Sequence, residues 1–266
     1  MSGLITLKDL FSLISILADL ILSFISSEIP EPDTNLSTKE LFNLTAFGNA
    51  PISSKTSFIC AKKPKSEKFA LVNPPTGNQP ERTAKINNNK RLTGAKAAYN
   101  VLRHYGIDNV SIVVTHGKLS DHYDPRSNTI RLSEEVFSGT SIAAVGIACH
   151  EAGHAAQHAQ NYVPIKVRNA ILPVANFGSS FGVILAVVGY ALGFGALTNI
   201  GIILFAAVVV FQLVTLPIEF NASTRAIKVI EATEMLYEDE VPKAKKVLFT
   251  AARTYLAWLL VSVMAL

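Results

Sequence analysis

The stretch that decides the fold is Ile142-Ala143-Ala144-Val145-Gly146-Ile147-Ala148-Cys149-His150-Glu151-Ala152-Gly153-His154. Thr140 or Ser141 can cap a helix that begins with this stretch and runs to about Gln160. On a helix, residues four apart share a face one turn apart, so His150 and His154 present their imidazoles in the same direction. An apolar, helical setting for two such histidines favours a buried site over a solvent-exposed pair.

The chemistry of this pattern is that of a metal centre. Two imidazoles at this spacing can reach one zinc ion at about 2.0–2.1 Å. Glu151, beside the first histidine, can take the proton of a water that attacks a peptide carbonyl. His158 continues the series of fours, but a further turn moves it about 6 Å along the axis, so a structural role is favoured over a third ligand. The residue six positions after His154 is Gln160, which excludes the three-histidine metzincin pattern.

A third ligand has to come from elsewhere in the chain, and catalytic zinc sites often combine two histidines with a carboxylate. Glu219 is the best candidate, because it follows Pro217 where an apolar segment gives way to a polar helical pattern. The alternative is an ordinary charged residue at a helix start, stabilised by the helix dipole. Glu231 is the next acidic residue to consider.

The composition is that of a membrane protein. Of 266 residues, 49% are hydrophobic and 17% charged, and the mean hydropathy is +0.33. The net charge of +4 is mild, and the basic residues do not cluster with aromatic residues as nucleic-acid binding requires. Cys60 and Cys149 are too few for a disulfide framework or a cysteine zinc site, and Cys149 is expected to be a small packed side chain.

Three parts follow one another along the chain. Residues 1–27 form an apolar segment with a polar stripe, and Asp19 leaves open whether it spans the bilayer or lies on its surface. Residues 28–91, rich in Pro, Asn, Ser, Thr and Lys, are expected to be a mobile linker, including the INNNK run at 86–90. Residues 92–266 form the domain that carries the motif.

Within that domain, apolar runs predict spanning helices near 174–197, 200–217 and 247–266, with Thr198-Asn199 as the turn of a membrane hairpin. The basic residues flank these runs on one side, which the positive-inside rule assigns to the cytoplasm or its organellar equivalent. They are Lys166, Arg168, Arg225, Lys228, Lys243, Lys245 and Lys246. The predicted site lies on the same side.

Before the motif helix, the sequence predicts a helix capped by Thr93, a strand at Val110 to Thr115, and a hairpin. The hairpin joins Leu119–Tyr123 to Thr129–Leu132. Thr129–Leu132 could be an edge strand that holds substrate beside the metal, with Asp121 and His122 lining the cleft. A solvated turn packed on the motif helix is the alternative. The fold class is therefore mainly α, with a zincin-like helix, a small β element and three spanning helices.

Several stretches of the chain match a known family: Leu92–Ala95, Ser120–Ser127, Thr140–Ala144, His150–Ala155, Arg168–Ala170, Pro173–Asn176 and Phe211–Ser223. With them the sequence resembles the YugP-like membrane neutral zinc metallopeptidases, and the resemblance covers the chain from about Leu92 to its C-terminus. More distantly, it is similar to HtpX-type and prenyl-protein membrane proteases, which also place spanning helices between the two halves of the site. The resemblance implies zinc held by His150, His154 and Glu219, with Glu151 as the catalytic base. In the distant relatives an Asp stands four residues after the matching Glu, whereas this chain has Ser223.

The expected function is zinc-dependent cleavage of peptide bonds in membrane-proximal or unfolded membrane proteins, with a polypeptide as substrate, the lipid bilayer as surroundings and no nucleic acid as partner. A non-catalytic scaffold with a structural metal or none is the alternative, and Glu151 argues against it because a structural site needs no base. An intramembrane protease is disfavoured, because the apolar runs after His154 contain no acidic residue.

Overall fold

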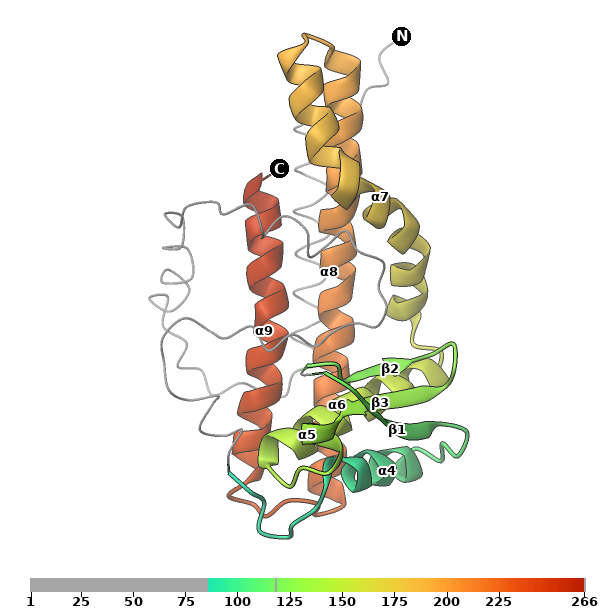
Figure 1. The fold of residues 1–266 in the computed structure, drawn as a ribbon, viewed down its shortest axis with the longest axis vertical. Coiled ribbons are helices and arrows are strands. Elements are labelled where there is room, and N and C mark those ends of the chain that lie inside the picture. Colours follow the sequence, from blue (N-terminus) through green and yellow to red (C-terminus); the bar gives the residue numbers. More distant parts are fainter. Residues whose placement is uncertain (1–85, 118, 266) are drawn as a thin grey trace. The chain divides into compact units, whose positions relative to one another are not determined.

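The computed structural model describes residues 86–117 and 119–265 (Figure 1). They fall into two compact units. The apolar helical unit comprises Val167–Pro217 and the residues from Leu256 onward, and the α+β unit comprises the described residues up to Lys166 together with Ile218–Tyr255. The predictions for residues 1–27 and for most of the polar tract lie outside the described residues.

The α+β unit begins with three helices and three strands. In chain order these are α4 (Gly94–His104), β1 (Ser111–Thr115), β2 (His122–Asp124), β3 (Thr129–Ser133), α5 (Glu134–Phe137) and α6 (Ile142–Ala159). The predicted caps are confirmed, since the Thr93 side chain accepts from the Lys96 N–H and the Ser141 side chain accepts from the Ala144 N–H. Satisfying these otherwise unpaired helix donors fixes where α4 and α6 begin.

The sheet has the strand order β1-β3-β2. β2 pairs antiparallel with β3, which confirms the predicted hairpin, and β1 pairs parallel with the other side of β3. The prediction that Thr129–Leu132 is an edge strand is therefore wrong, because β3 has a partner on both sides. Asp121 is buried and its carboxylate accepts from the Ser133 N–H at 2.7 Å, which ties the start of β2 to the end of β3.

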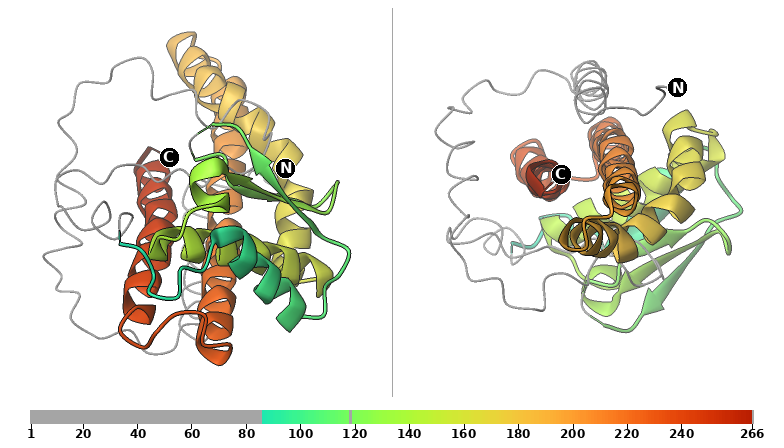
Figure 2. Two further views of the ribbon diagram at one scale, coloured as in Figure 1. Left: turned by 60° about the horizontal axis from the view of Figure 1, so that its bottom comes forward. Right: turned by 90° about the horizontal axis from the view of Figure 1, so that it is seen from above.

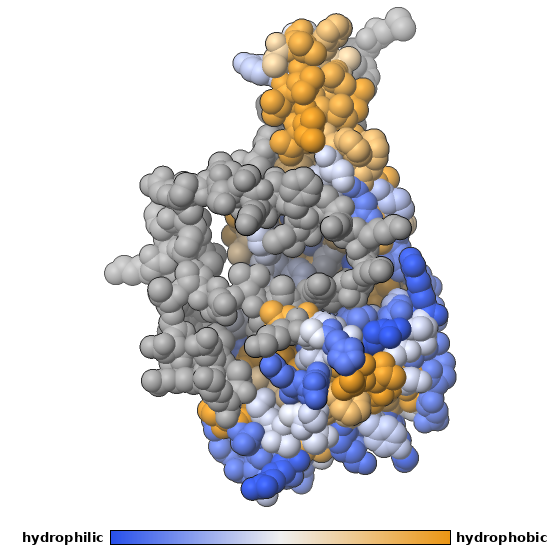
Figure 3. Space-filling model, in the orientation of Figure 1, coloured by the Kyte–Doolittle hydropathy of each residue, from blue (hydrophilic) through white to orange (hydrophobic). Residues whose placement is uncertain are grey.

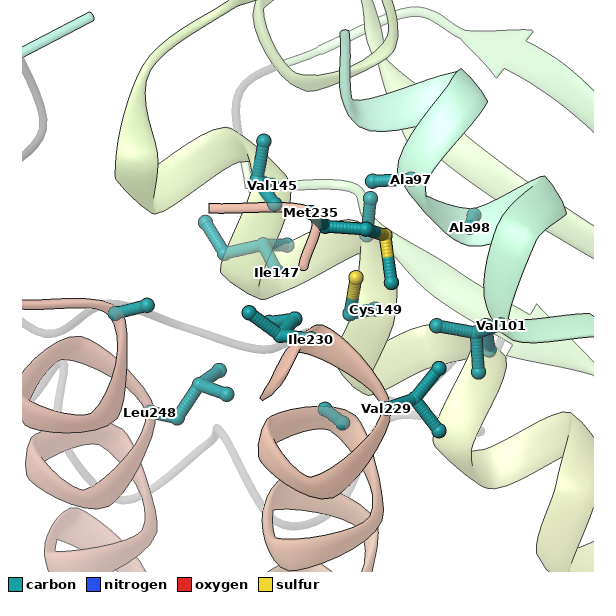
Figure 4. Packing of buried hydrophobic residues seen from close by; sticks show 14 of the residues in the cluster. Ala97, Ala98, Val101, Val145, Ile147, Cys149, Val229, Ile230, Met235 and Leu248 are labelled. Atoms are coloured by element: carbon teal, nitrogen blue, oxygen red, sulfur yellow. The ribbon is translucent and has the colours of Figure 1, made fainter. Parts of the chain in front are cut away.

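The core of the α+β unit surrounds α6. Figure 4 shows side chains of α4 and α6 meeting those of Val229, Ile230 and Leu248 in one cluster, with Cys149 in its centre. Cys149 is fully buried, and burial raises the pKa of its thiol, so it packs as a neutral apolar residue, as predicted. Because small side chains dominate α6, neighbouring elements approach it closely on several faces.

The end of the polar tract belongs to this unit. The Asn88 side chain is 1% exposed; its amide donates to the Leu92 and Thr140 carbonyls, and its oxygen accepts from the Leu92 N–H. The backbone N–H of Asn89 donates to the Glu240 carboxylate at 2.8 Å. The folded part therefore starts before Leu92, because an asparagine-rich run that composition assigns to a linker is held by specific hydrogen bonds.

Three long helices complete the chain: α7 (Val163–Ala191), α8 (Gly195–Ala232) and α9 (Val241–Ala265). Each contains a segment long and apolar enough to cross a membrane, in agreement with the three predicted spans. The surface of the α7–α8 hairpin is hydrophobic over its far end (Figure 3). The two helices run side by side there (Figure 2), and at Gly178 an added Cβ would lie 2.1 Å from the Leu204 carbonyl oxygen.

Two details of these helices differ from the predictions. The hairpin turns at residues 192–194 and not at Thr198-Asn199, because Gly193 adopts φ +71° and lets the Phe194 N–H close the end of α7 onto Gly189. Pro217 does not end a helix, and Glu219 lies inside α8 and not at a new helix start. Pro173 lies within α7, which changes direction along its length (Figure 1).

Candidate metal centre

Three predicted residues converge within the α+β unit. His150 and His154 come from α6 and Glu219 comes from α8, and one donor atom of each lies within 4.8 Å of the others. The Nε2 atoms of His150 and His154 lie 3.4 and 3.8 Å from the two carboxylate oxygens of Glu219. Among the described residues this is the group of His, Cys, Asp and Glu side chains that can hold a metal ion.

The spacing of these atoms fits a small tetrahedral ion. Ligands at about 2.0–2.1 Å from a tetrahedral zinc lie roughly 3.3–3.5 Å apart. The observed nitrogen-to-oxygen distances of 3.4 and 3.8 Å need little closure to reach that value. His150 and Glu219 are only 1% and 2% exposed, whereas the His154 side chain is 13% exposed, so the group opens toward solvent at His154.

Each histidine is oriented by a hydrogen bond to its other nitrogen. His150 Nδ1 lies 3.1 Å from the Ser223 hydroxyl, and His154 Nδ1 lies 3.0 Å from Oε1 of Gln157. A carbonyl oxygen only accepts, so His154 carries its proton on Nδ1 and turns the Nε2 lone pair toward Glu219. Imidazole lone pairs and carboxylate oxygens repel each other unless a cation lies between them. This set of donor atoms therefore fits a divalent metal ion.

The surroundings keep His154 in the form that binds metal. Burial, with a smaller contribution from the neighbouring His150, lowers the pKa of His154 to about 4, although Glu219 and the hydrogen bond to Gln157 oppose that shift. The imidazole is consequently neutral at physiological pH. A neutral imidazole offers the lone pair that a metal requires.

Glu151 lies beside the three converging residues and not among them. Its carboxylate is 3% exposed and accepts from the Tyr123 N–H of β2 at 3.0 Å. Burial raises its pKa well above the ordinary value, as do the charges of Glu219 and Asp121, and the bond from Tyr123 opposes the rise. A carboxyl group with a raised pKa beside a metal group has the character of a general base.

Other residues considered from the sequence lie outside the group. His158 is exposed, with Nδ1 3.4 Å from the Tyr123 hydroxyl, which agrees with a structural role. The His122 Nδ1 atom lies 2.7 Å from the Ser120 carbonyl oxygen, and the Asp121 carboxylate accepts a hydrogen bond from the Ser133 N–H. Glu231 is exposed near the end of α8.

Two supporting residues were not found from the sequence. Gln157 is fully buried and touches His154, and its amide nitrogen donates to Asn221 at 2.9 Å. Its position three residues after His154 on the same helix was a usable signal, since residues three apart are neighbours on a helix surface. Asn221 comes from α8, and no spacing rule connects it to α6.

Comparison with known proteins identifies the family of this chain. Residues 76–266 match the family described as "Putative neutral zinc metallopeptidase". The chain belongs to this family. It is also 43% identical over 186 residues to the "Putative membrane protease YugP" of Bacillus subtilis (strain 168), covering 70% of this chain and 83% of that protein. No match was found among solved structures.

The family assignment covers every residue of the candidate metal centre, because the matched range includes α6 and α8 entirely. It confirms the resemblance seen in the sequence. The three apolar helices and the name of the Bacillus relative agree in placing the chain among membrane proteins.

Proposed function

We propose that this protein is a zinc-dependent membrane endopeptidase. The observation that carries the proposal is the convergence of His150, His154 and Glu219 beside a buried Glu151. Two histidines and a carboxylate form a common ligand set of catalytic zinc, and they leave a coordination position for water or substrate. The family description supports zinc in particular.

The residues of the site have separate roles in the proposed reaction. His150, His154 and Glu219 would hold the ion, which when bound acidifies a water and polarises the peptide carbonyl. Glu151 would accept the proton of the attacking water and then pass it to the departing amine nitrogen. Its raised pKa suits both steps, because a base that is too weak cannot take the proton and one that is too strong cannot return it.

The edge strand β2 is the candidate holder of substrate. Among the described strands, β2 pairs on one side with β3, and its Tyr123 N–H points to Glu151 on the other. A substrate added alongside β2 in an extended conformation would run past the carboxylate of the base. This assigns to β2 the role first expected for β3.

The substrate class is a polypeptide, and we propose membrane-proximal or unfolded membrane proteins. The support is that α8 is one continuous helix which contains both an apolar segment and Glu219, two residues after Pro217. The basic residues around the apolar runs support a cytoplasmic, or equivalent organellar, position of the site. A non-catalytic scaffold is the competing function, and a buried base beside the metal group argues against it.

The test is metal content and peptide cleavage by the purified full-length chain. We expect about one zinc per chain, in line with a single three-ligand site, and cleavage of a casein substrate that stops on chelation and returns with added zinc. His150→Ala and His154→Ala should each remove the zinc from folded protein. Stoichiometric zinc in either variant would contradict the assigned site, and zinc without any cleavage of casein or detergent-solubilised membrane proteins would favour the scaffold.

A further inference from the structure

A chain of hydrogen bonds leads away from His154 to the surface of the α+β unit. His154 Nδ1 contacts Oε1 of Gln157 at 3.0 Å, and Nε2 of Gln157 donates to Oδ1 of Asn221 at 2.9 Å. The same Asn221 oxygen accepts from Nε of Arg225 at 2.7 Å. The chain therefore crosses from α6 to α8 and ends on a cation.

The direction of every bond follows from two partners whose roles are fixed, the Arg225 guanidinium and the Ile218 carbonyl. A guanidinium donates and never accepts, so the Asn221 atom that faces it has to be the oxygen. The Gln157 atom that faces this oxygen has to be the amide nitrogen, which also donates to the Ile218 carbonyl at 2.8 Å. With its nitrogen engaged by two acceptors, Gln157 turns its oxygen to His154.

We propose that Arg225, Asn221 and Gln157 are positioning residues that fix the His154 tautomer, a role that rests on the metal-binding function proposed above. An oxygen at His154 Nδ1 requires the ring proton there, and in a neutral imidazole this leaves the lone pair on Nε2. The Nε2 atom is the one that faces Glu219 at 3.8 Å. The Arg225 donor and the Ile218 carbonyl together thus select which nitrogen of His154 faces the metal ligands.

Burial keeps this chain of bonds from rearranging. Gln157 and Asn221 are 0% and 5% exposed. If either amide were flipped, buried N–H groups would face other donors and buried oxygens would face other acceptors, which is unfavourable. Arg225 is held by Oε1 of Gln160 at 2.6 Å and by the rings of Tyr105 and Tyr162, whose centroids lie 5.8 and 5.9 Å away. The guanidinium is consequently oriented independently of the metal ligands.

The other histidine offers an internal comparison. His150 Nδ1 contacts the Ser223 hydroxyl, which can rotate to donate or to accept. This contact does not select a tautomer by itself. Changes at Arg225 should therefore affect His154 and leave the ring of His150 unchanged.

The first test reads the tautomer directly in metal-free, full-length wild-type protein labelled with ¹⁵N-histidine. We expect the His154 ring, assigned with a His154→Ala variant, to show a protonated Nδ1 and an unprotonated Nε2. Arg225→Met should shift part of the His154 population toward Nε2–H without altering the His150 signals. A wild-type His154 that carries its proton on Nε2 would overturn the proposal, whatever the variants do.

The second test measures zinc affinity by competition with a chelator. Gln157→Met, which keeps the volume and removes the acceptor, should weaken binding by about 10–100-fold, and Arg225→Met by roughly tenfold. Gln157→Glu, which keeps an oxygen at His154, should bind more tightly than Gln157→Met. Lys228→Met removes an exposed cation from the same helix and should match the wild type.

The outcomes separate the two proposals. Wild-type protein that binds no zinc would overturn the metal-binding function and this role with it. Wild-type protein that binds zinc, with Gln157→Met and Arg225→Met as tight as Lys228→Met, would overturn the positioning role alone.

Discussion

Two glutamates share the candidate metal centre but have different partners. Glu219 faces the Nε2 atoms of His150 and His154, whereas Glu151 is held by the backbone N–H of Tyr123. Both are almost fully buried, and the charge of Glu219 contributes to the raised pKa of Glu151. In the proposed function Glu219 is a ligand, whose charge the ion would balance, and Glu151 is the base that exchanges a proton.

Glu151→Gln should separate these roles. The amide can keep the hydrogen bond from Tyr123 but cannot take a proton from water, so the rate of casein cleavage should fall by about 10²–10⁴-fold or more. Zinc content should stay at the wild-type value, because Glu151 is not among the three converging residues. Glu134→Gln, at an exposed position on α5, is the matched control and should cleave normally. A Glu151→Gln variant as active as this control would remove Glu151 from the mechanism.

Glu219→Ala should weaken zinc binding by at least the 10–100-fold typical of losing a supporting residue. The reason is that two histidines from one helix leave the ion without the charged donor that completes the set. Glu231→Ala, an exposed acidic residue further along α8, should bind zinc as the wild type does. Equal zinc affinity in Glu219→Ala and wild type would place the third ligand elsewhere, and a loss in Glu231→Ala would identify it.

Among the residues of the candidate site, the sequence predicted those whose identity and spacing form a known metal-binding pattern. His150, Glu151 and His154 form a local pattern, and Glu219 was placed by its position after an apolar run and by family resemblance. Gln157 and Asn221 were not predicted, because a buried amide acquires its role from the atoms around it. The hydrogen bond from the Tyr123 N–H to Glu151 could not be predicted either, because every residue except proline has a backbone N–H and the sequence does not show which one is used.

The α6 and α8 helices meet backbone to backbone beside the metal group. At Gly153 an added Cβ would lie 2.7 Å from the Ala222 carbonyl oxygen, closer than real Cβ contacts. Gly146, on the same helix, could carry a methyl group, because a Cβ added there would lie 3.7 Å from the Leu248 side chain, an ordinary van der Waals distance. The distance between the histidines of α6 and the glutamate of α8 thus depends on residue 153 being a glycine, which has no side chain.

The pair Gly153→Ala and Gly146→Ala tests this dependence. Gly153→Ala should lower the free energy of unfolding by about 1–3 kcal/mol, since helix backbones have to separate. It should also weaken zinc binding, because His154 and Glu219 move apart. Gly146→Ala should raise stability by roughly 0.5–1 kcal/mol through its helix propensity and leave zinc binding unchanged. Denaturation and chelator competition measure both effects; a Gly153→Ala variant indistinguishable from Gly146→Ala would contradict the close-contact account.

Element boundaries were predicted well where a local cap decides them and poorly where tertiary packing does. Ser141 and Thr93 mark helix starts through side-chain hydrogen bonds that the sequence signals directly. Pro217 was expected to end a helix, yet α8 continues through it, as proline is tolerated within membrane helices. β3 was taken for an edge because its pairing with β1 is a contact between segments separated in the chain.

Over the whole molecule, the positions of charge and of apolar helices specify a topology. α7 and α8 form a hairpin whose tip, residues 192–194, carries no charge, and basic residues lie in the first turns of α7 and of α9. The positive-inside rule favours the cytoplasmic, or equivalent organellar, side for these basic residues, which is the topology proposed above. The site residues lie in the same unit as Lys166, Lys243, Lys245 and Lys246.

Cysteine labelling tests this topology with three single replacements at exposed positions: Lys166→Cys in the first turn of α7, Ala196→Cys at the hairpin tip and Lys246→Cys near the start of α9. The background should lack the native thiols, with Cys60→Ser and Cys149→Ala. A membrane-impermeant maleimide should label positions 166 and 246 only in inside-out vesicles and position 196 only in right-side-out vesicles, because α7 and α8 each cross the bilayer once. Labelling of positions 166 and 246 from opposite faces would contradict the hairpin, and with it the return of the chain that brings Glu219 to the side of the histidines.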